Sequence, residues 1–494
     1  MEKNNMKKSI YKLSLVLSLA LASVSCDFDT DLAQNTDTAN AYKTVQDVSN
    51  GTVGAYQALA YYPFLGNYAV AFGDFAGGLA NGSSSSGHFY AVSEWTVSDT
   101  DAEMEGIWDY GFKVVDRAVR TINGGETLLS ANPDMGSSDK ATIYYNLSQC
   151  HALRALAYFT MAQYFCYPYS AGTASKGLPL VKDKPVEAFA NAARASLGDT
   201  YAFMLEDISK ALEYSELAGS PSLQYFYMNT AAIYALKARV SLYMGLYDDA
   251  EVAAKKAIEL KNKGNATYTD LTPTDETYLN MWASLSITDE DIFTLSKTEN
   301  DNLSANALNT LYGSYNGKVS NYARTFFEDT DMRAQLIGTV DSNSGSCMKW
   351  QGLEASQATS NIPIFRKSEM ALIVAECEAR AGHIAEAQKY LGYTAKRDKQ
   401  YAAEDGSCDL SKLPADKESL LDFIWKENTR EFFGEGHFFA EARRLGKTVT
   451  VMGGRCTTFR PAKFVFPIPS AEINAGFLKD QNTGWEDSLP EADS

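Results

Sequence analysis

Two long stretches of the sequence combine aromatic rings with small polar side chains, and this combination suits one kind of chemistry. Residues 60–110 and residues 262–364 carry many Tyr, Trp and Phe among Asn, Asp, Ser, Thr and Gly. A sugar ring has an apolar C–H face and a fringe of hydroxyl groups, so a flat aromatic side chain flanked by amides and carboxylates can bind it. The two stretches therefore predict a ligand-binding surface. Most of their phenylalanines are expected in the core, and the exposure of Trp95, which precedes the largely polar run 96–101, is left open.

No catalytic pattern accompanies these aromatic residues. The chain has no GxSxG, HExxH, phosphate-loop or dinucleotide-binding motif, and its glycines near residue 80 are too loosely spaced to form one. Its 62 carboxylates leave open a pair suited to glycoside hydrolysis, but no pair stands out. We therefore predict a binding protein and not an enzyme, with no catalytic residue and no cofactor.

The cysteines and histidines give no sign of a metal centre. No CxxC pair is present, and the four histidines lie far apart in the sequence. A zinc site needs closely spaced ligands, so none is expected. Apart from Cys26, we expect buried, unpaired thiols. These are Cys150, Cys166, Cys347, Cys377, Cys408 and Cys456.

Helices must position the two aromatic stretches. Apolar residues recur at three- and four-residue steps in 141–164, 199–215, 229–260, 368–393 and 418–445. Small residues recur at the same offsets in two of these blocks, as in tetratricopeptide repeats. The matching sets are Ala238, Gly245, Tyr247, Ala250 and Ala375, Gly382, Ile384, Ala387. The expected fold class is mainly α, with about four tetratricopeptide-like helix pairs and long irregular, partly β inserts that form the ligand face.

The N-terminus and the charge indicate where the chain works. Lys7, Lys8 and Lys12 precede an apolar stretch at 13–22, and small residues lead to Cys26, an arrangement that resembles a bacterial lipoprotein signal. We predict a signal peptide at 1–25, a lipidated Cys26 that begins a flexible tether at 26–40, and a single domain at 41–494. The alternative is a plain secreted protein in which Cys26 is incidental. The net charge of −18 argues against nucleic-acid binding.

Three motifs resemble those of the SusD/RagB-like surface lipoproteins. They are the run 362–376, with its Arg-x-x-Glu helix start, the run 430–444, and the C-terminal run 466–485. Their charged residues are expected to form buried ion pairs or helix caps, because an unpaired buried charge is costly. These residues are Arg366, Glu369, Glu376, Arg430, Glu431 and Glu435. Phe438 and Glu441 stand where the family usually has Arg and Asp.

The resemblance implies a partner and a set of ligand residues. It implies a surface-exposed lipoprotein of the outer membrane that captures a glycan or oligosaccharide and delivers it to a SusC-like, TonB-dependent transporter. Helix pairs would face the transporter, and the inserts would face the ligand. Asp74, Trp95 and Asp101 match positions near family binding sites. Four further candidates are assigned by segment only: Tyr278, Trp282, Tyr312 and Tyr315.

Two other functions remain open from the sequence. Some members of the family serve peptide uptake, and an aromatic cleft can bind peptide backbones as well as sugar faces. A helical-repeat lipoprotein that binds only other proteins is the third possibility.

Overall fold

The structure is a computed structural model that describes residues 41–185, 192–219, 224–262, 278–279, 281–282, 287–351, 360–453 and 456–485. Residues Thr44–Ser494 form one compact unit, separate from Met1–Lys43. The predicted signal peptide, the lipidated Cys26 and the tether lie outside the described residues.

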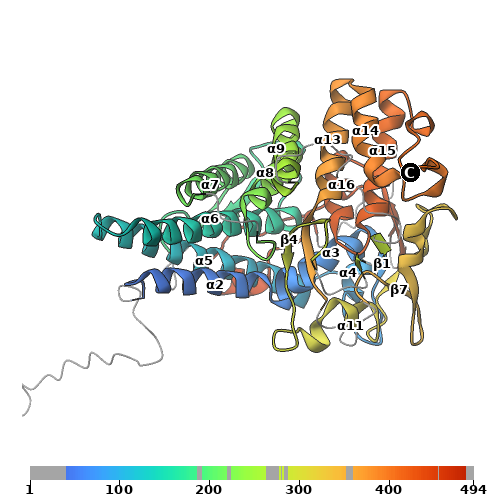
Figure 1. Ribbon diagram of the computed structural model, residues 1–494. Helices are drawn as coiled ribbons and strands as arrows, with labels where there is room; N and C mark the ends of the chain where they lie inside the picture. Colours follow the sequence, from blue (N-terminus) through green and yellow to red (C-terminus); the bar gives the residue numbers. More distant parts are fainter. Residues whose placement is uncertain are drawn as a thin grey trace, which may run out of the picture. The chain divides into compact units, whose positions relative to one another are not determined.

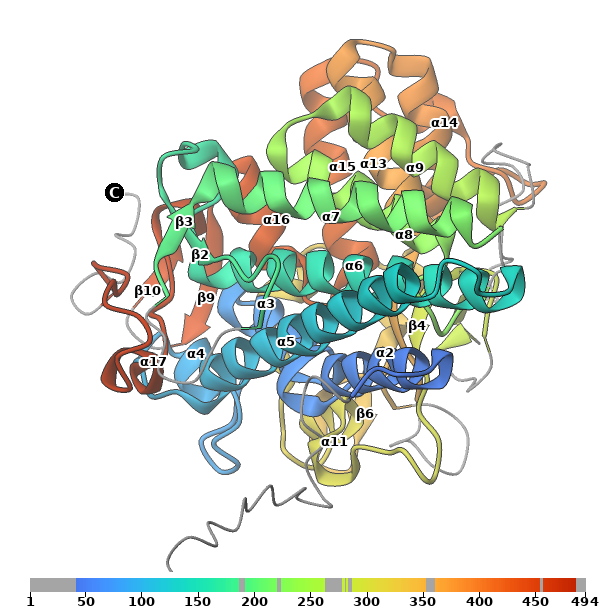
Figure 2. The same ribbon diagram turned by 90° about the vertical axis from the view of Figure 1, so that its left-hand side faces the viewer.

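Helices make up most of the compact unit, as the sequence predicts. In Figure 2, α7, α6, α5 and α2 lie side by side, and each packs against the next. Helix α8 packs against α7, and α9 packs against α8. A second group, α13 to α16, is drawn in orange and red in Figure 1, and its helix α13 packs against α9. The long helices are α2 (Val45–Leu59), α5 (Ala102–Ala131), α6 (Ser137–Phe165), α7 (Leu197–Leu217), α8 (Thr230–Met244), α9 (Tyr247–Lys261), α13 (Lys367–Ala381), α14 (Ile384–Ala395), α15 (Lys417–Phe432) and α16 (His437–Leu445).

The two tetratricopeptide-like blocks are helix pairs with the same turn. Helices α8 and α9 are joined through Gly245, and α13 and α14 through Gly382. Both glycines adopt left-handed backbone angles, with φ of 76° and 88°, which end the first helix of each pair without a Cβ clash. Ala238 and Ala375 are fully buried, so the paired helices approach closely. The predicted mainly helical fold class is confirmed.

Short strands and helices form the inserts between the long helices. Each described sheet has two antiparallel strands: β1 with β5, β2 with β3, β4 with β8, β6 with β7, and β9 with β10. The strands are β1 (Ala80–Asn81), β2 (Lys176–Pro179), β3 (Arg194–Ser196), β4 (Asp291–Leu295), β5 (Lys318–Val319), β6 (Ile337–Val340), β7 (Asn343–Cys347), β8 (Ile362–Arg366), β9 (Val449–Gly453) and β10 (Cys456–Phe459). The short helices of five residues or fewer include η2 (Tyr62–Gly66), α4 (Tyr90–Ser93), α11 (Leu308–Tyr312), α12 (Asn321–Arg324) and α17 (Ser470–Asn474).

One helix lies where the sequence gives no helical periodicity. Helix α3 (Tyr68–Gly77) runs through the first aromatic stretch, and all of its residues except Tyr68 are buried. A helix that is covered on every side has no polar face, so apolar residues do not recur at helical steps. The prediction of an irregular segment is therefore wrong for these ten residues.

Two kinds of feature are absent from the described residues. No helix among them has the length and apolar character needed to cross a membrane. In the same part of the chain, no group of three or more His, Cys, Asp or Glu side chains is arranged to hold a metal ion.

Candidate ligand-binding surface

The structure brings the two aromatic stretches together. Strand β1 pairs with β5, so residue 80 of the first stretch lies opposite residue 319 of the second. Next to this pairing, the backbone N–H of Ser320 donates to the carbonyl of Leu79 at 2.8 Å. The hydroxyl of Ser86 donates to the carbonyl of Tyr315, also at 2.8 Å. Segments more than 200 residues apart in sequence thus share one surface.

A stacked pair of rings marks this junction. The rings of His88 and Tyr315 lie 4.5 Å apart between centroids with an interplanar angle of 10°, and both side chains are half-buried. Phe89 and Asn316, the neighbours of the pair, have φ of 53° and 56°. Left-handed backbone is costly for residues other than glycine and concentrates at functional sites. The pair is therefore held in place by a constrained backbone on both sides.

We call the buried rings next to the pair its floor, because Phe89 follows His88 in the chain and Tyr312 lies three residues before Tyr315. Phe89 stacks on Phe75 with 4.7 Å between centroids, and Phe75 lies 5.6 Å from Tyr312. Tyr312 is fully buried, and its backbone carbonyl accepts hydrogen bonds from Ser346 and Asn343. The prediction of Tyr312 as a ligand-facing ring is wrong, since it belongs to the support of the surface.

Asp74 also lies below the surface. Its side chain is buried on α3 and accepts a 3.3 Å hydrogen bond from the backbone N–H of Gly436. Its Oδ1 has no hydrogen-bond partner among the described residues. Burial raises the pKa of Asp74 to about 7, against the lowering effect of the neighbouring N–H groups. A buried carboxyl group cannot contact a ligand at the surface, so this residue is removed from the predicted contact set.

Trp95 lies in a cage of phenylalanines. Its side chain is only 2% exposed, and rings from four distant positions surround it at centroid distances of 4.4 to 6.3 Å. The four rings belong to Phe439, Phe459, Phe464 and Phe466. The polar run that follows Trp95 does not expose it, because its backbone, with a φ of 55°, turns the ring into the core. Trp95 is therefore not a ligand-stacking ring.

Tyr278 and Trp282 cover buried charges instead of facing solvent. The guanidinium of Arg397 lies 4.0 Å from the ring centroid of Tyr278, and the ammonium of Lys349 lies 4.7 Å from that of Trp282. Their exposed fractions are 1% and 6%. These contacts are cation–π interactions in a desolvated setting. The expectation that these two rings form the ligand face is wrong.

Asp101 is half-buried and closes the loop before α5. Its Oδ2 accepts a 2.8 Å hydrogen bond from the backbone N–H of Ser98, and it stands at the N-terminal cap position of the helix. Burial raises the pKa of Asp101. Of the seven predicted ligand residues, Asp101 and Tyr315 keep side chains that solvent can reach, and their contact with a ligand stays a prediction.

Arg366, Glu431 and Glu435 of the C-terminal motifs join other buried charges in what we call the ion cluster. Arg366 contacts Glu431 and Glu435, each at 2.9 Å, and Arg333 contacts Glu427 at 2.7 Å. Its cations are Arg333, Lys349, Arg366 and Arg397, and its carboxylates are Glu290, Asp331, Glu427, Glu431 and Glu435. Neighbouring guanidiniums outweigh burial and lower the pKa of Glu427 to about 2, and they lower that of Glu431 further. The prediction of buried ion pairs is confirmed.

The two departures from the family pattern are also explained. Glu441 contacts Arg444 at 2.6 Å, and Arg444 also contacts Glu376 at 2.6 Å. Phe438 stacks on Trp425 with 5.1 Å between centroids. An ion pair therefore persists at Glu441, and an aromatic contact occupies the position of the missing arginine.

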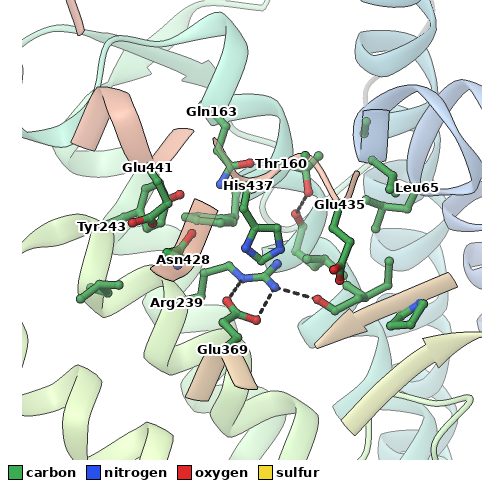
Figure 3. A pocket seen from close by; sticks show the side chains of 18 of the residues that line it. Leu65, Thr160, Gln163, Arg239, Tyr243, Glu369, Asn428, Glu435, His437 and Glu441 are labelled. Atoms are coloured by element: carbon green, nitrogen blue, oxygen red, sulfur yellow. Dashed lines mark hydrogen bonds and ion pairs between the residues drawn. The ribbon is translucent and has the colours of Figure 1, made fainter. Parts of the chain in front are cut away.

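Two hollows lie among the helices, away from the His88–Tyr315 pair. Figure 3 shows the smaller, in which His437 lies beside Arg239, itself bonded to Glu369 at 2.6 Å. Its volume is about 60 Å³. A cavity of about 150 Å³ is needed to hold benzene, so no sugar ring fits. The larger is a groove of about 410 Å³ between α8, α13, α15 and α16, and its one tryptophan, Trp425, is 7% exposed.

His88 is the site residue that sequence reasoning missed. From the sequence it is considered only as a possible metal ligand, because its stacking partner, Tyr315, lies more than 200 residues later in the chain. Its position at the end of the Gly- and Ser-rich run 77–87 is the signal that could have identified it, since such a run allows close approach of another segment.

The comparisons with known proteins agree with this architecture. Residues 342–485 match the model of the SusD family. A SusD superfamily protein from Bacteroides thetaiotaomicron VPI-5482 shares the fold with a TM-score of 0.75 and 23% identity, over 89% of this chain and 100% of that chain. A SusD superfamily protein from Bacteroides vulgatus ATCC 8482 has a TM-score of 0.75 and 23% identity, over 90% of this chain and 99% of that chain.

A third structure is described as a SusD-like carbohydrate binding protein from Bacteroides vulgatus ATCC 8482. It has a TM-score of 0.69 and 18% identity, over 88% of this chain and 98% of that chain. No curated protein matches the sequence. The chain is SusD/RagB-like: residues 342–485 carry the sequence pattern of the SusD family, and the fold is that of SusD superfamily proteins.

Proposed function

We propose that this protein is a carbohydrate-binding lipoprotein of the outer-membrane surface. It captures an oligosaccharide at the surface around His88 and Tyr315 and delivers it to a TonB-dependent, SusC-like transporter. Cys26 carries the lipid anchor, and residues 26–40 are the tether. The protein binds its ligand and does not cleave it.

The observation that carries the proposal is the half-buried, stacked His88–Tyr315 pair at the junction of the two aromatic stretches. A stacked pair held by its backbone offers a preformed flat face, so little side-chain entropy is lost on binding. Ser, Asn and Gly residues surround it in both segments and supply hydrogen-bond partners for sugar hydroxyls. The description of a fold relative as a carbohydrate binding protein supports the same ligand class.

Weak binding at one site is enough for this role. A dissociation constant of ~10 μM to 1 mM corresponds to about −7 to −4 kcal/mol. One or two stacked sugar rings and a few hydrogen bonds supply free energies of this size. Repeating units of a polymer would raise the effective affinity further.

The test is a titration of the protein lacking residues 1–26 against a panel of plant, host and microbial glycans beside peptides. We expect binding to at least one glycan, and roughly two- to tenfold weaker binding for Tyr315→Ala, because a stacked ring contributes about 0.5–1.5 kcal/mol. The matched control is Tyr144→Ala, which removes a half-buried ring that stacks on Tyr214 on the helical scaffold. Binding to peptides alone would contradict the proposal and favour peptide uptake.

A further inference from the structure

A second group of partly exposed rings lies on the first aromatic stretch, and we call it the tyrosine platform. It consists of Tyr61, Tyr62, Tyr68 and Tyr110. Tyr61 is 43% exposed, and the other three side chains are half-buried. None of the four was singled out as a candidate from the sequence.

The rings of the platform contact one another in a row. Tyr61 lies between Tyr110 and Tyr62, with centroid distances of 5.2 Å and 4.8 Å, and Tyr62 lies 5.4 Å from Tyr68. The rings come from the end of α2, from η2, from α3 and from α5. Two stretches of the chain, residues 61–68 and helix α5, thus present their tyrosines on one patch.

Hydrogen bonds and buried neighbours fix the backbone that carries Tyr61 and Tyr62. The carbonyl of Tyr61 accepts from the N–H groups of Phe64 and Gly66 at 3.0 Å and 3.1 Å. The Phe64 side chain is fully buried and anchors the turn from below. A Cβ on Gly66 would lie 2.5 Å from the carbonyl oxygen of Ala60, so only glycine permits this tight turn.

A glycine on α5 allows the platform to lie against the helix. A Cβ on Gly106 would lie 2.9 Å from both Pro63 Cβ and Tyr68 Cδ2. Because Gly106 has no side chain, Pro63 and Tyr68 rest directly on the helix backbone. The tyrosines are therefore preorganised, which lowers the entropy lost when a ligand binds.

The platform continues into the surface already described. The ring of Tyr68 lies 5.7 Å from that of Phe89, whose own ring stacks on Phe75 beneath the His88–Tyr315 pair. Phe89 follows His88 directly in the chain. One unbroken series of ring contacts therefore joins the tyrosine platform to the floor of the candidate ligand-binding surface.

The charges around the platform limit the ligand that it can take. Glu103 accepts a 2.9 Å hydrogen bond from the N–H of Phe89, and Asp109 is paired with Lys113 at 2.7 Å. The Lys113 ammonium lies 4.0 Å from the ring centroid of Tyr110. Lys113 is thus already engaged by a carboxylate and a ring. Lys297 donates to the carbonyl of Ala60 at 3.2 Å, and its side chain is buried. Neither of these described lysines offers a free cation to an anionic polymer, whereas ring faces and phenol hydroxyls suit an uncharged sugar chain.

We propose that the tyrosine platform is a second carbohydrate subsite, which binds further units of a long, uncharged polysaccharide whose other units occupy the His88–Tyr315 pair. This inference rests on the proposed function. It assigns to the protein a preference for long chains over short ones, because a polymer that spans both subsites gains from effective concentration and a short oligosaccharide does not.

The test compares a short oligosaccharide with its parent polysaccharide, using the glycan that binds best in the panel. The double variant Tyr61→Ala/Tyr110→Ala is titrated with both ligands beside the native protein, Tyr315→Ala and the scaffold control Tyr144→Ala. We expect the double variant to bind the short ligand as the native protein does and to bind the polysaccharide roughly tenfold or more weakly. Native circular dichroism and an unchanged melting temperature show that the variant is folded.

The variant Tyr61→Phe keeps the ring and removes the hydroxyl, and it should retain most of the polysaccharide affinity. Native polysaccharide binding by the double variant would overturn the inference and leave the proposed function standing. An equal loss for both ligands would also overturn it, since the tyrosines would then belong to the primary site. Absence of glycan binding by the native protein would overturn the proposed function and the inference together.

Discussion

The ion cluster and the His88–Tyr315 pair lie in one compact unit but are built in opposite ways. In the ion cluster, every cation contacts at least one carboxylate, and Arg333 and Glu431 are fully buried. At the stacked pair, two half-buried rings are held by a constrained backbone. The ion cluster stabilises the fold, whereas the His88–Tyr315 pair is part of the surface that solvent can reach.

The largest expected effect comes from breaking the ion cluster. Glu431→Gln removes the carboxylate that faces Arg333, Arg366 and Arg397, so each of these buried guanidiniums loses one of its carboxylate partners. We expect a loss of about 3–5 kcal/mol in the free energy of unfolding, measured by urea titration. A loss below about 1 kcal/mol, as at a surface pair, would show that the cluster is not structural.

Trp95→Ala separates packing from binding. Removing a buried ring that four phenylalanines surround should cost about 3–5 kcal/mol of stability, because a cavity remains. Glycan affinity of the folded protein should stay at the native value, since the ring does not reach the surface. A loss of glycan affinity without a loss of stability would show that Trp95 contacts the ligand and would contradict its burial in the core.

The two regions should respond in opposite directions to pH. The pKa of Glu427 is lowered to about 2, so its contribution to stability is present above about pH 4.5 and is lost as the pH falls through about 2. The pKa of Asp74 below the ligand surface is raised to about 7. The folded state therefore holds this proton more tightly than the unfolded state, and stability is lost as the pH rises from about 4 through about 7.

Asp74→Asn isolates the contribution of Asp74 to the pH dependence of stability. The asparagine amide oxygen still accepts a hydrogen bond, but the side chain does not ionise. Relative to the native protein, the variant should gain stability between pH 4 and pH 8, by up to roughly 4 kcal/mol, since each pKa unit is worth about 1.4 kcal/mol. The measurement is urea unfolding of both proteins at pH 4, 6 and 8. A difference that does not change with pH would show that Asp74 ionises normally.

The smallest effect is expected at the surface. Asp109→Asn removes an exposed ion pair with Lys113, at 2.7 Å, and should change the free energy of unfolding by less than about 1 kcal/mol. The same urea titration checks it. A larger loss would mean that the tyrosine platform depends on this charge for its stability.

Local patterns sufficed to predict the helical scaffold. The offsets of Ala238, Gly245 and Ala250 define a helix, a left-handed turn and a second helix within about 15 residues, so the sequence contains all the needed information. The ion pairs were predicted from the cost of burying charge, which holds whatever the partners are. Helix α3 was missed because burial on all sides erases the amphipathic pattern.

The burial of individual rings could not be predicted in the same way. Trp95 is buried by residues more than 340 positions later in the chain, and its own neighbours in sequence are polar. Tyr278 and Trp282 are buried by cations on segments far from them. Tertiary packing decides whether a ring is exposed. A segment rich in aromatic residues indicates only where exposed rings can occur.

The most direct measurement is the structure of the protein crystallised with an oligosaccharide that binds in the panel. We expect a sugar ring stacked against the His88–Tyr315 pair, with Trp95, Tyr278, Trp282 and Tyr312 still buried. A ligand seated in the groove between α8, α13, α15 and α16, or one that contacts neither ring of the pair, would contradict it.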